Sequence, residues 1–259
     1  MRKTSERYTP SKDIDEIYCE HMQRYLFAKD FIQNKDILDI ACGSGYGAHF
    51  LAKNGARRVV GVDISEEAIR YCKKRYHSDN LSFQVMDATH LRFPESTFQA
   101  VVSFETIEHV AHPDSILVEL KRVLQPQGTI IISTPNQKVY GLLGGDAHRF
   151  HVKELCLGEF KDLISCYFEA PKLYGQRRSE HYEKKTLAYP HAIQEATRKN
   201  ALLRENPFQL KNLIPLKVRQ YLSKKIMNLP FPTVTSCEDL VISEDHLEES
   251  KFFVCVAAK

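Results

Sequence analysis

The chain has 259 residues, of which 43% are hydrophobic and 27% charged, with a formal net charge of +3 at pH 7. These values fit one large domain, or a domain with a cap, that buries a real core. No apolar run approaches the roughly 18 residues of a transmembrane helix, and residues 1–7 lack a signal peptide's apolar segment, so we expect a cytoplasmic protein. Seven cysteines without a Cys-x-x-Cys pair favour reduced thiols over a disulfide framework.

Helices and strands alternate through the first half of the sequence. Apolar spacing predicts helices at four places: 13–33, 46–54, 66–75 and 114–124. Segments rich in apolar residues predict strands at five: 37–41, 58–62, 81–85, 99–104 and 129–133. Strands that are apolar on both faces and alternate with helices indicate a parallel sheet covered on both sides.

The pattern changes after residue 133. A loop over 134–152 precedes a predicted helix over 153–166 and a strand over 171–175. Residues 177–228 read as a mostly helical insertion, and 238–257 as a β-hairpin. We therefore expect an α/β fold: a doubly wound, mostly parallel, seven-stranded sheet with an antiparallel C-terminal hairpin and a helical insertion.

Acidic residues lie at the ends of successive predicted strands, beside a glycine-rich turn. Asp39 lies in the first strand, Asp63 ends the second, and Asp87 follows the third. The turn after the first strand has glycine at alternate positions: Gly43, Gly45 and Gly47. Glycines let a ligand approach the backbone, and a carboxylate about 20 residues further on suits the two hydroxyls of a ribose. The sequence therefore predicts a nucleoside site.

These segments resemble, in order, the motifs of class I S-adenosylmethionine-dependent methyltransferases. The stretch DIACGSG at 39–45 matches their first motif, D/E-x-x-x-G-x-G. The later motifs match at four places: VDIS at 62–65, MDA at 86–88, FQAVV at 98–102 and LQPQG at 124–128. The resemblance covers roughly residues 20–170. The last hundred residues look more loosely like surface-glycan and natural-product sugar methyltransferases.

The resemblance implies where the methionine part of S-adenosylmethionine would bind. The turn would pass close to it, through Gly43, Ser44 and Gly45. Asp39 and the carbonyl of Phe104 would face its ammonium group. Arg24, on the helix before the first strand, would pair with its carboxylate; the alternative is that Arg24 is a solvated charge on that helix.

The resemblance also implies contacts with the adenosine part. Asp63 would bind the ribose hydroxyls and Ile64 would lie against the adenine. Asp87 would accept from the adenine amino group, beside the amide of Ala88. A dinucleotide site is the alternative: it needs G-x-G-x-x-G, and the alanine at position 48 is tolerated there. Asp87 and the later motifs favour the methyl donor.

Glu105, Glu108 and His109 follow the fourth strand, and their spacing of three and four residues predicts one face of a helix that opens there. Such a cluster can bind Mg²⁺, Mn²⁺ or Zn²⁺, and a metal would orient a substrate hydroxyl and lower its pKa. The string E-x-x-E-H resembles that of ubiquinone-biosynthesis O-methyltransferases and small-RNA 2′-O-methyltransferases, where a later histidine completes the site. His151 holds that position here, with His148 in reserve. In the metal-free alternative His109 is the general base and Glu108 is structural; His109 and Glu105 are the catalytic candidates.

The basic charge is concentrated in one segment. Residues 177–225 contain twelve Lys or Arg and four acidic residues, a net charge of +8. This suits a small-molecule acceptor that is acidic or carries phosphate, such as a nucleotide sugar, a glycan or a lipid-linked intermediate. Residues 213–227 are amphipathic and basic, which permits contact with a membrane surface. The alternative is that they form a solvated helix face. The absence of tryptophan and a pI near 8.4 disfavour nucleic acid as a partner.

Four segments result: an N-terminal helical lid over 1–35, a cofactor-binding core over 36–176, a basic cap for the acceptor over 177–230 and the C-terminal hairpin over 231–259. The function that the resemblance implies is S-adenosylmethionine-dependent O-methylation of a sugar, glycan or other small metabolite, with or without a divalent metal. The alternatives are metal-free N- or C-methylation of a small molecule, RNA 2′-O-methylation, and a noncatalytic nucleoside-binding protein.

Overall fold

The structure is a computed structural model that describes residues 16–140, 151–182 and 236–259. The chain divides into two compact units, one of Met1–Arg177 with Val241–Lys259 and one of Arg178–Leu240. Most of the second unit, and with it most of the basic segment and all of 213–227, lies outside the described residues, as do residues 1–15 of the predicted lid.

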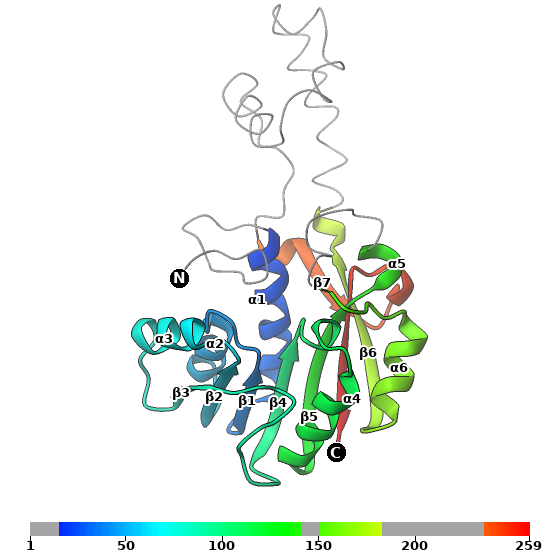
Figure 1. Ribbon diagram of the computed structural model, residues 1–259. Helices are drawn as coiled ribbons and strands as arrows, with labels where there is room; N and C mark the ends of the chain where they lie inside the picture. Colours follow the sequence, from blue (N-terminus) through cyan, green and yellow to red (C-terminus); the bar gives the residue numbers. More distant parts are fainter. Residues whose placement is uncertain (1–15, 141–150, 183–235) are drawn as a thin grey trace, which may run out of the picture. The chain divides into compact units, whose positions relative to one another are not determined.

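The sheet has eight strands in the order β3-β2-β1-β4-β5-β8-β6-β7. Five strands are parallel and lie side by side in Figure 1: β1 (Asp36–Ile40), β2 (Arg58–Asp63), β3 (Leu81–Val85), β4 (Phe98–Phe104) and β5 (Leu124–Pro135). Three follow: β6 (Glu169–Arg178), β7 (Leu240–Ser243) and β8 (Phe252–Ala258). The chain order reverses on either side of β1, which pairs with both β2 and β4. That is where open α/β sheets bind ligands, beyond the carboxyl ends of the strands.

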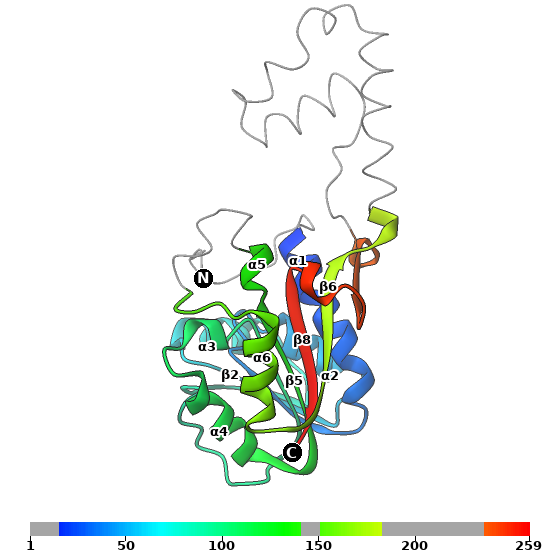
Figure 2. The same ribbon diagram turned by 90° about the vertical axis from the view of Figure 1, so that its right-hand side faces the viewer.

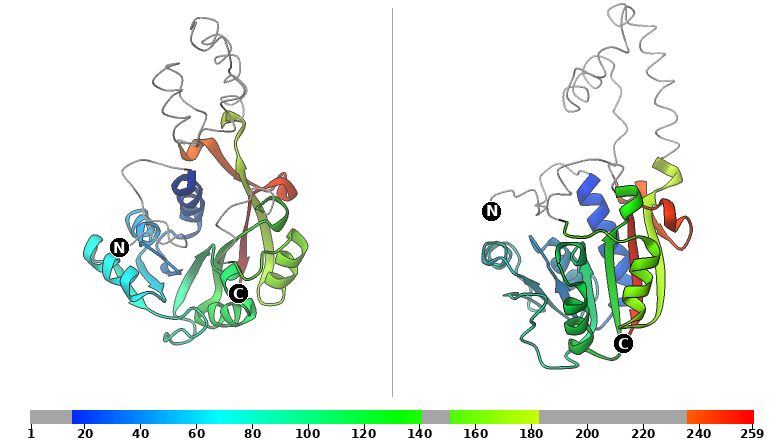
Figure 3. Two further views of the ribbon diagram at one scale, coloured as in Figure 1. Left: turned by 45° about the horizontal axis from the view of Figure 1, so that its top comes forward. Right: turned by 45° about the vertical axis from the view of Figure 1, so that its right-hand side comes forward.

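Helices cover both faces of the sheet, as Figures 2 and 3 show. On one face lie α1 (Glu16–Ala28), α2 (Tyr46–Lys53) and α3 (Glu66–Arg75). On the other lie α4 (Pro113–Val123) and α6 (Leu157–Ser165). Neighbouring strand residues alternate between the two cores: Ile37 and Val59 pack in the first, Leu38 and Val60 in the second. The expected α/β doubly wound fold is confirmed.

The antiparallel part differs in detail from the prediction. The sheet has eight strands instead of seven, and β7 and β8 do not form a hairpin, because β6 lies between them. β8 is antiparallel to both β5 and β6, and most of its residues are buried. A strand buried on both faces gains from a neighbour on each side, whereas the half-buried β7 suits the edge of the sheet.

Local sequence signals place several element ends correctly. The α3 helix begins after Ser65, whose hydroxyl accepts from the backbone N–H of Ala68 at 3.3 Å, and Glu66 and Glu67 occupy its first turn. The α1 helix, which begins the described chain at Glu16, passes at Ala28 into a 3₁₀ turn, η1 (Lys29–Phe31). A short helix, α5 (Gln137–Tyr140), lies within the segment predicted as a loop, and two further 3₁₀ turns, η7 (Cys237–Asp239) and η8 (Leu247–Glu249), flank β7.

The seven cysteines all lie in the described residues and none forms a disulfide there. Among the helices that the structure describes, none is long and apolar enough to cross a membrane.

Candidate functional site

The glycine-rich turn connects β1 to α2 through two residues with left-handed backbone, Gly43 (φ +55°) and Gly45 (φ +77°). A Cβ atom on Gly43 would meet nothing closer than the Ala41 carbonyl oxygen at 3.9 Å, so this residue borders open space. A Cβ atom on Gly45 would lie 2.6 Å from the Cys72 sulfur, and one on Gly47 would overlap the Tyr25 ring. The first glycine thus leaves room for a ligand, and the others permit close internal packing.

Asp63 ties the end of β2 to this turn. One carboxylate oxygen accepts from the backbone N–H of Gly43 at 3.0 Å and the other from that of Ser65 at 2.8 Å. The side chain is buried, whereas the adjacent Ile64 is 66% exposed. An exposed apolar side chain next to a fixed carboxylate offers the two surfaces that a nucleoside needs, one for its base and one for its ribose.

Asp87 and Ala88 follow β3 at the same edge of the sheet. The Asp87 carboxylate accepts from both the backbone N–H and the hydroxyl of Thr89, each at 2.8 Å. The backbone N–H of Met86 donates to the Asp63 carbonyl at 3.1 Å, which fixes the end of β3 beside the end of β2. Asp87 itself is exposed and open to a ligand.

Asp39 lies within β1, fully buried. The Tyr25 hydroxyl donates to its two carboxylate oxygens at 3.2 and 3.3 Å. Burial raises the pKa of Asp39 to about 8, although the Tyr25 hydrogen bond acts in the opposite direction. No described cation forms an ion pair with Asp39, so a positive group on a ligand would favour its charged form.

Arg24 is completely buried, which rules out the alternative that it is a solvated charge on the helix. Its guanidinium donates to the Gln176 side chain, lies 4.6 Å from the centre of the Phe252 ring, and has one nitrogen 3.6 Å from a Glu105 oxygen. Arg24 therefore joins α1 to β6 and β8. Its Nε and Nη2 atoms are buried without a hydrogen bond, and pairing with a methionine carboxylate stays a prediction.

No long helix begins at Glu105, so the expected single helical face is wrong. Glu105 has a left-handed backbone (φ +53°), and only one 3₁₀ turn, η2 (Ile107–His109), follows before α4 begins at Pro113. The backbone N–H of Glu105 donates to the Ser133 carbonyl at 3.3 Å, which directs the chain along β5 instead of into a helix. Proline suits the first position of a helix, which explains the later start of α4. The Glu105 side chain accordingly meets Arg24.

Of the four expected metal ligands the structure gathers three, Glu108, His109 and His151, whose ligand-type atoms all lie within 4.8 Å of one another; Glu105 is not among them. The two imidazole rings have centres 5.0 Å apart, at an angle of 79°. The segment that carries His151 is held in place because the backbone N–H groups of Val152 and Lys153 donate to the Glu108 carbonyl, at 2.7 and 3.3 Å. The α6 helix begins at Leu157 and not at 153 because Cys156 is its N-cap, with the Glu159 carboxylate accepting from the Cys156 backbone N–H at 3.0 Å. His148 lies outside the described residues.

Glu108 is buried, with one carboxylate oxygen accepting from the Thr134 hydroxyl at 3.2 Å and the other without a hydrogen bond. Burial, and then the neighbouring Glu105, raise the pKa of Glu108 well above its usual range. A buried oxygen without a donor, next to two imidazoles, suits a cation or a bound proton.

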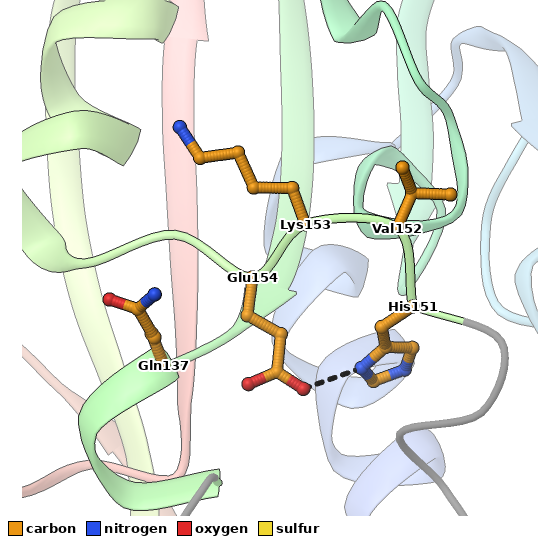
Figure 4. A pocket seen from close by; sticks show the side chains of 5 residues that line it. All are labelled: Gln137, His151, Val152, Lys153 and Glu154. Carbon is orange, nitrogen blue, oxygen red and sulfur yellow. Dashed lines mark hydrogen bonds and ion pairs between the residues drawn. The ribbon is translucent and has the colours of Figure 1, made fainter.

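A cavity of about 360 Å³ lies beside this cluster. Figure 4 shows the residues that line it: Gln137, His151, Val152, Lys153 and Glu154. A Glu154 oxygen lies 2.7 Å from Nδ1 of His151.

Comparison with known proteins bears on these features. The sequence profile of a family described as a methyltransferase domain matches residues 38–132. Residues 38–132 are a methyltransferase domain. This domain belongs to the class I S-adenosylmethionine-dependent methyltransferases, as the order of the motifs indicated.

Two relatives and one solved structure give the extent of the similarity. A probable S-adenosylmethionine-dependent methyltransferase of Mycolicibacterium smegmatis is 33% identical over 132 residues, half of each chain. A ubiquinone biosynthesis O-methyltransferase of Coxiella burnetii is 29% identical over 48% of this chain and 55% of its own. A Thermotoga maritima structure described as a SAM-dependent methyltransferase and possible histamine N-methyltransferase has a TM-score of 0.61, covering 93% of this chain and 91% of its own at 16% identity, which supports the fold. The chain spans about half the length of the curated relatives it matches.

The methyltransferase domain brings most of the predicted donor-binding residues to one edge of the sheet. The turn, Asp63, Ile64 and Asp87 lie at the ends of β1, β2 and β3. Asp39 lies within β1, and Phe104 ends the neighbouring strand β4. Four side chains were missed: Tyr25, Thr134, Glu154 and Gln176. Only Glu154, three residues after His151, could have been noticed from its spacing; the others are contacts between distant parts of the sequence.

Proposed function

We propose that this protein transfers the methyl group of S-adenosylmethionine to a hydroxyl group of a small molecule, such as a sugar, a glycan or another metabolite. The observation that carries the proposal is the Glu108, His109 and His151 cluster, which lies just after β4, the strand next to β1 and its glycine-rich turn. A domain of the methyltransferase family supplies the donor chemistry, and the cluster supplies a place for the acceptor's proton.

The donor would be held by the residues at the strand ends. The space beside Gly43 takes the chain of the methionine part, Asp39 faces its ammonium group, and Asp63 accepts from the ribose hydroxyls. Asp87 and Ile64 hold the adenine. A buried carboxylate without a counter-charge and an open surface over a left-handed glycine both fit this ligand.

The chemistry is an in-line displacement. The acceptor oxygen forms a bond to the methyl carbon while the bond from that carbon to sulfur breaks, and the hydroxyl proton goes to a base. Alignment and exclusion of water supply most of the rate, so the chain's main task is to hold the two molecules in line. His109 is half-buried next to Glu108 and is the proposed base, because an imidazole accepts a proton near neutral pH.

The alternative to His109 as base is that the same three side chains hold a divalent metal ion, in which case His109 is a ligand and not the base. Glu108 has a buried oxygen without a hydrogen bond, and two imidazoles lie within reach of it. Two nitrogen donors and one carboxylate suit Mn²⁺, Fe²⁺ or Zn²⁺ better than Mg²⁺, which prefers oxygen ligands. A metal there would supply a Lewis acid that lowers the pKa of the acceptor hydroxyl. Glu105, held by Arg24, is left out of this ligand set.

The proposed acceptor carries a negative charge, because residues 177–225 have a net charge of +8. Contact of residues 213–227 with a membrane surface remains a prediction.

The test is mass spectrometry of a metabolite extract incubated with the protein and S-adenosylmethionine carrying a deuterated methyl group. A small molecule that gains one labelled methyl supports the proposal, and the position of the label distinguishes oxygen from nitrogen or carbon. Label found only in added bulk RNA, or bound donor with no methylated product, would overturn it. Activity that EDTA abolishes and Mn²⁺ restores supports the metal, and activity unchanged by EDTA removes it.

A further inference from the structure

We infer that Glu154 is a positioning residue that holds the His151 imidazole in the tautomer with its proton on Nδ1, so that the Nε2 lone pair serves the Glu108, His109 and His151 cluster. The role of the cluster in this inference rests on the proposed function. The tautomer of the His151 ring rests only on the contacts between His151 and Glu154.

The contact between the two residues is short and shielded. Nδ1 of His151 lies 2.7 Å from a Glu154 carboxylate oxygen, and the two side chains are only 9% and 10% exposed. An ionised carboxylate only accepts hydrogen bonds, so Nδ1 is the donor and carries the proton. Figure 4 shows the carboxylate of Glu154 pointing at this nitrogen, with the second ring nitrogen on the side away from Glu154. Because Nδ1 is used here, Nε2 is the atom with a lone pair.

The backbone keeps the two residues in this arrangement. At one end of the segment, Val152 and Lys153 donate to the Glu108 carbonyl. At the other end, the backbone N–H of Gln137 donates to the Leu155 carbonyl at 3.1 Å. Val152 is 60% exposed and Lys153 bonds to Glu159 at 2.9 Å, so neither intervening side chain competes for the ring.

The arrangement matches what a ligand or base histidine requires. A carboxylate on one ring nitrogen fixes the ring's direction and raises the basicity of the other nitrogen. Loss of such a partner commonly weakens metal affinity about 10- to 100-fold. The centre of the His109 ring lies 5.0 Å from that of His151, so both imidazoles lie beside the Glu108 carboxylate.

The experiment uses the full chain labelled with ¹⁵N-histidine, without metal, and reads the tautomer of His151 from long-range ¹H–¹⁵N spectra, with His151→Gln to assign the signals. The wild type should show the Nδ1–H tautomer. Glu154→Ala should move His151 towards the Nε2–H tautomer that imidazole side chains favour in water, and Glu154→Gln, whose amide oxygen still accepts, should restore part of the Nδ1–H form. If Glu154→Ala fails to fold, the wild type and Glu154→Gln still decide the question.

The matched control is Glu159→Gln, in the same stretch of chain. Glu159 bonds to Lys153 and to the backbone N–H of Cys156, and glutamine can keep the second bond at a helix start. This variant should leave the tautomer unchanged.

Titration of the apo proteins with Mn²⁺ alone gives a second readout. Glu154→Ala should bind about 10- to 100-fold more weakly than the wild type, and Glu159→Gln should bind equally well. A wild type that shows the Nδ1–H tautomer but binds no Mn²⁺ removes the metal from the proposed function and supports the positioning role. An Nε2–H tautomer in the wild type, or a signal that Glu154→Ala does not move, overturns the inference whatever the protein methylates.

Discussion

Binding of S-adenosylmethionine should release a proton, because Asp39 is protonated in the free protein and charged in the complex. Its pKa is about 8 in the folded chain, against about 4 in an unfolded chain. Between these values the folded state holds a proton that the unfolded state has lost. The bound proton therefore stabilises the folded state fully below pH 4. As the pH rises from 4 to 8 this contribution is lost, and the free energy of unfolding falls by up to about 1.4 kcal/mol per pH unit.

The ligand reverses this burial cost by placing an ammonium group beside the carboxylate. One proton should leave on binding near pH 6.5, and the affinity should rise up to about tenfold per pH unit between pH 5.5 and 7.5. Above about pH 8 the rise should stop, since Asp39 is then charged in both states and the ammonium group of the ligand begins to lose its own proton.

Isothermal titration calorimetry in two buffers with different ionisation enthalpies measures the released proton directly. Asp39→Asn keeps the hydrogen bond from Tyr25 but has no charge, so it should bind more weakly, release no proton and show no rise with pH. The matched control is Asp36→Asn in the same strand. Arg57 and Arg58 pair with Asp36 at 2.8 and 3.0 Å and hold the pKa of Asp36 below its usual range. Asp36 is therefore not the source of the proton, and Asp36→Asn should still release one on binding the donor. Equal proton release by wild type and Asp39→Asn would refute the reasoning.

Four further variants test other parts of the site. Asp63→Ala removes the acceptor for two backbone N–H groups and for the ribose, so calorimetry should show at least about a 100-fold loss of donor affinity; wild-type affinity would contradict this. Gly47→Ala puts a Cβ atom into the Tyr25 ring and should lower the free energy of unfolding in urea by about 1–3 kcal/mol. Gly43→Ala should lower it by about 1 kcal/mol, because of the left-handed backbone there, but should weaken donor binding more than Gly47→Ala does. If Gly47→Ala weakens donor binding more than Gly43→Ala, the open space beside Gly43 is not where the donor binds. His109→Ala should bind the donor normally and lose turnover about 100-fold or more, and retained turnover excludes it as the base.

The sequence predicted the elements whose signals are local. Helix α3 and strand β3 match to the residue, because Ser65 caps the helix and apolar residues alternate with polar ones along the strand. The position of Asp63 and Asp87 at one edge of the sheet was also predictable, since carboxylates at the ends of parallel strands must meet there.

What the sequence could not supply were choices between distant partners. Whether β8 pairs with β7 or with β5 depends on which neighbours can bury its two faces, and no local pattern contains that information. The position of Glu105 depends on its left-handed backbone and on Arg24, whose burial is set by Gln176 and Phe252 far along the chain. Helical spacing in E-x-x-E-H therefore added Glu105 wrongly to the expected metal ligands, whereas the other three, Glu108, His109 and His151, do lie together.

The most direct test of the account is a crystal structure of the protein with S-adenosylhomocysteine. We expect the ribose hydroxyls at the Asp63 carboxylate, the adenine between Ile64 and the Asp87–Ala88 segment, and the ammonium group within reach of Asp39. Electron density for the compound elsewhere, or an edge of the sheet left empty at saturating concentration, would contradict it.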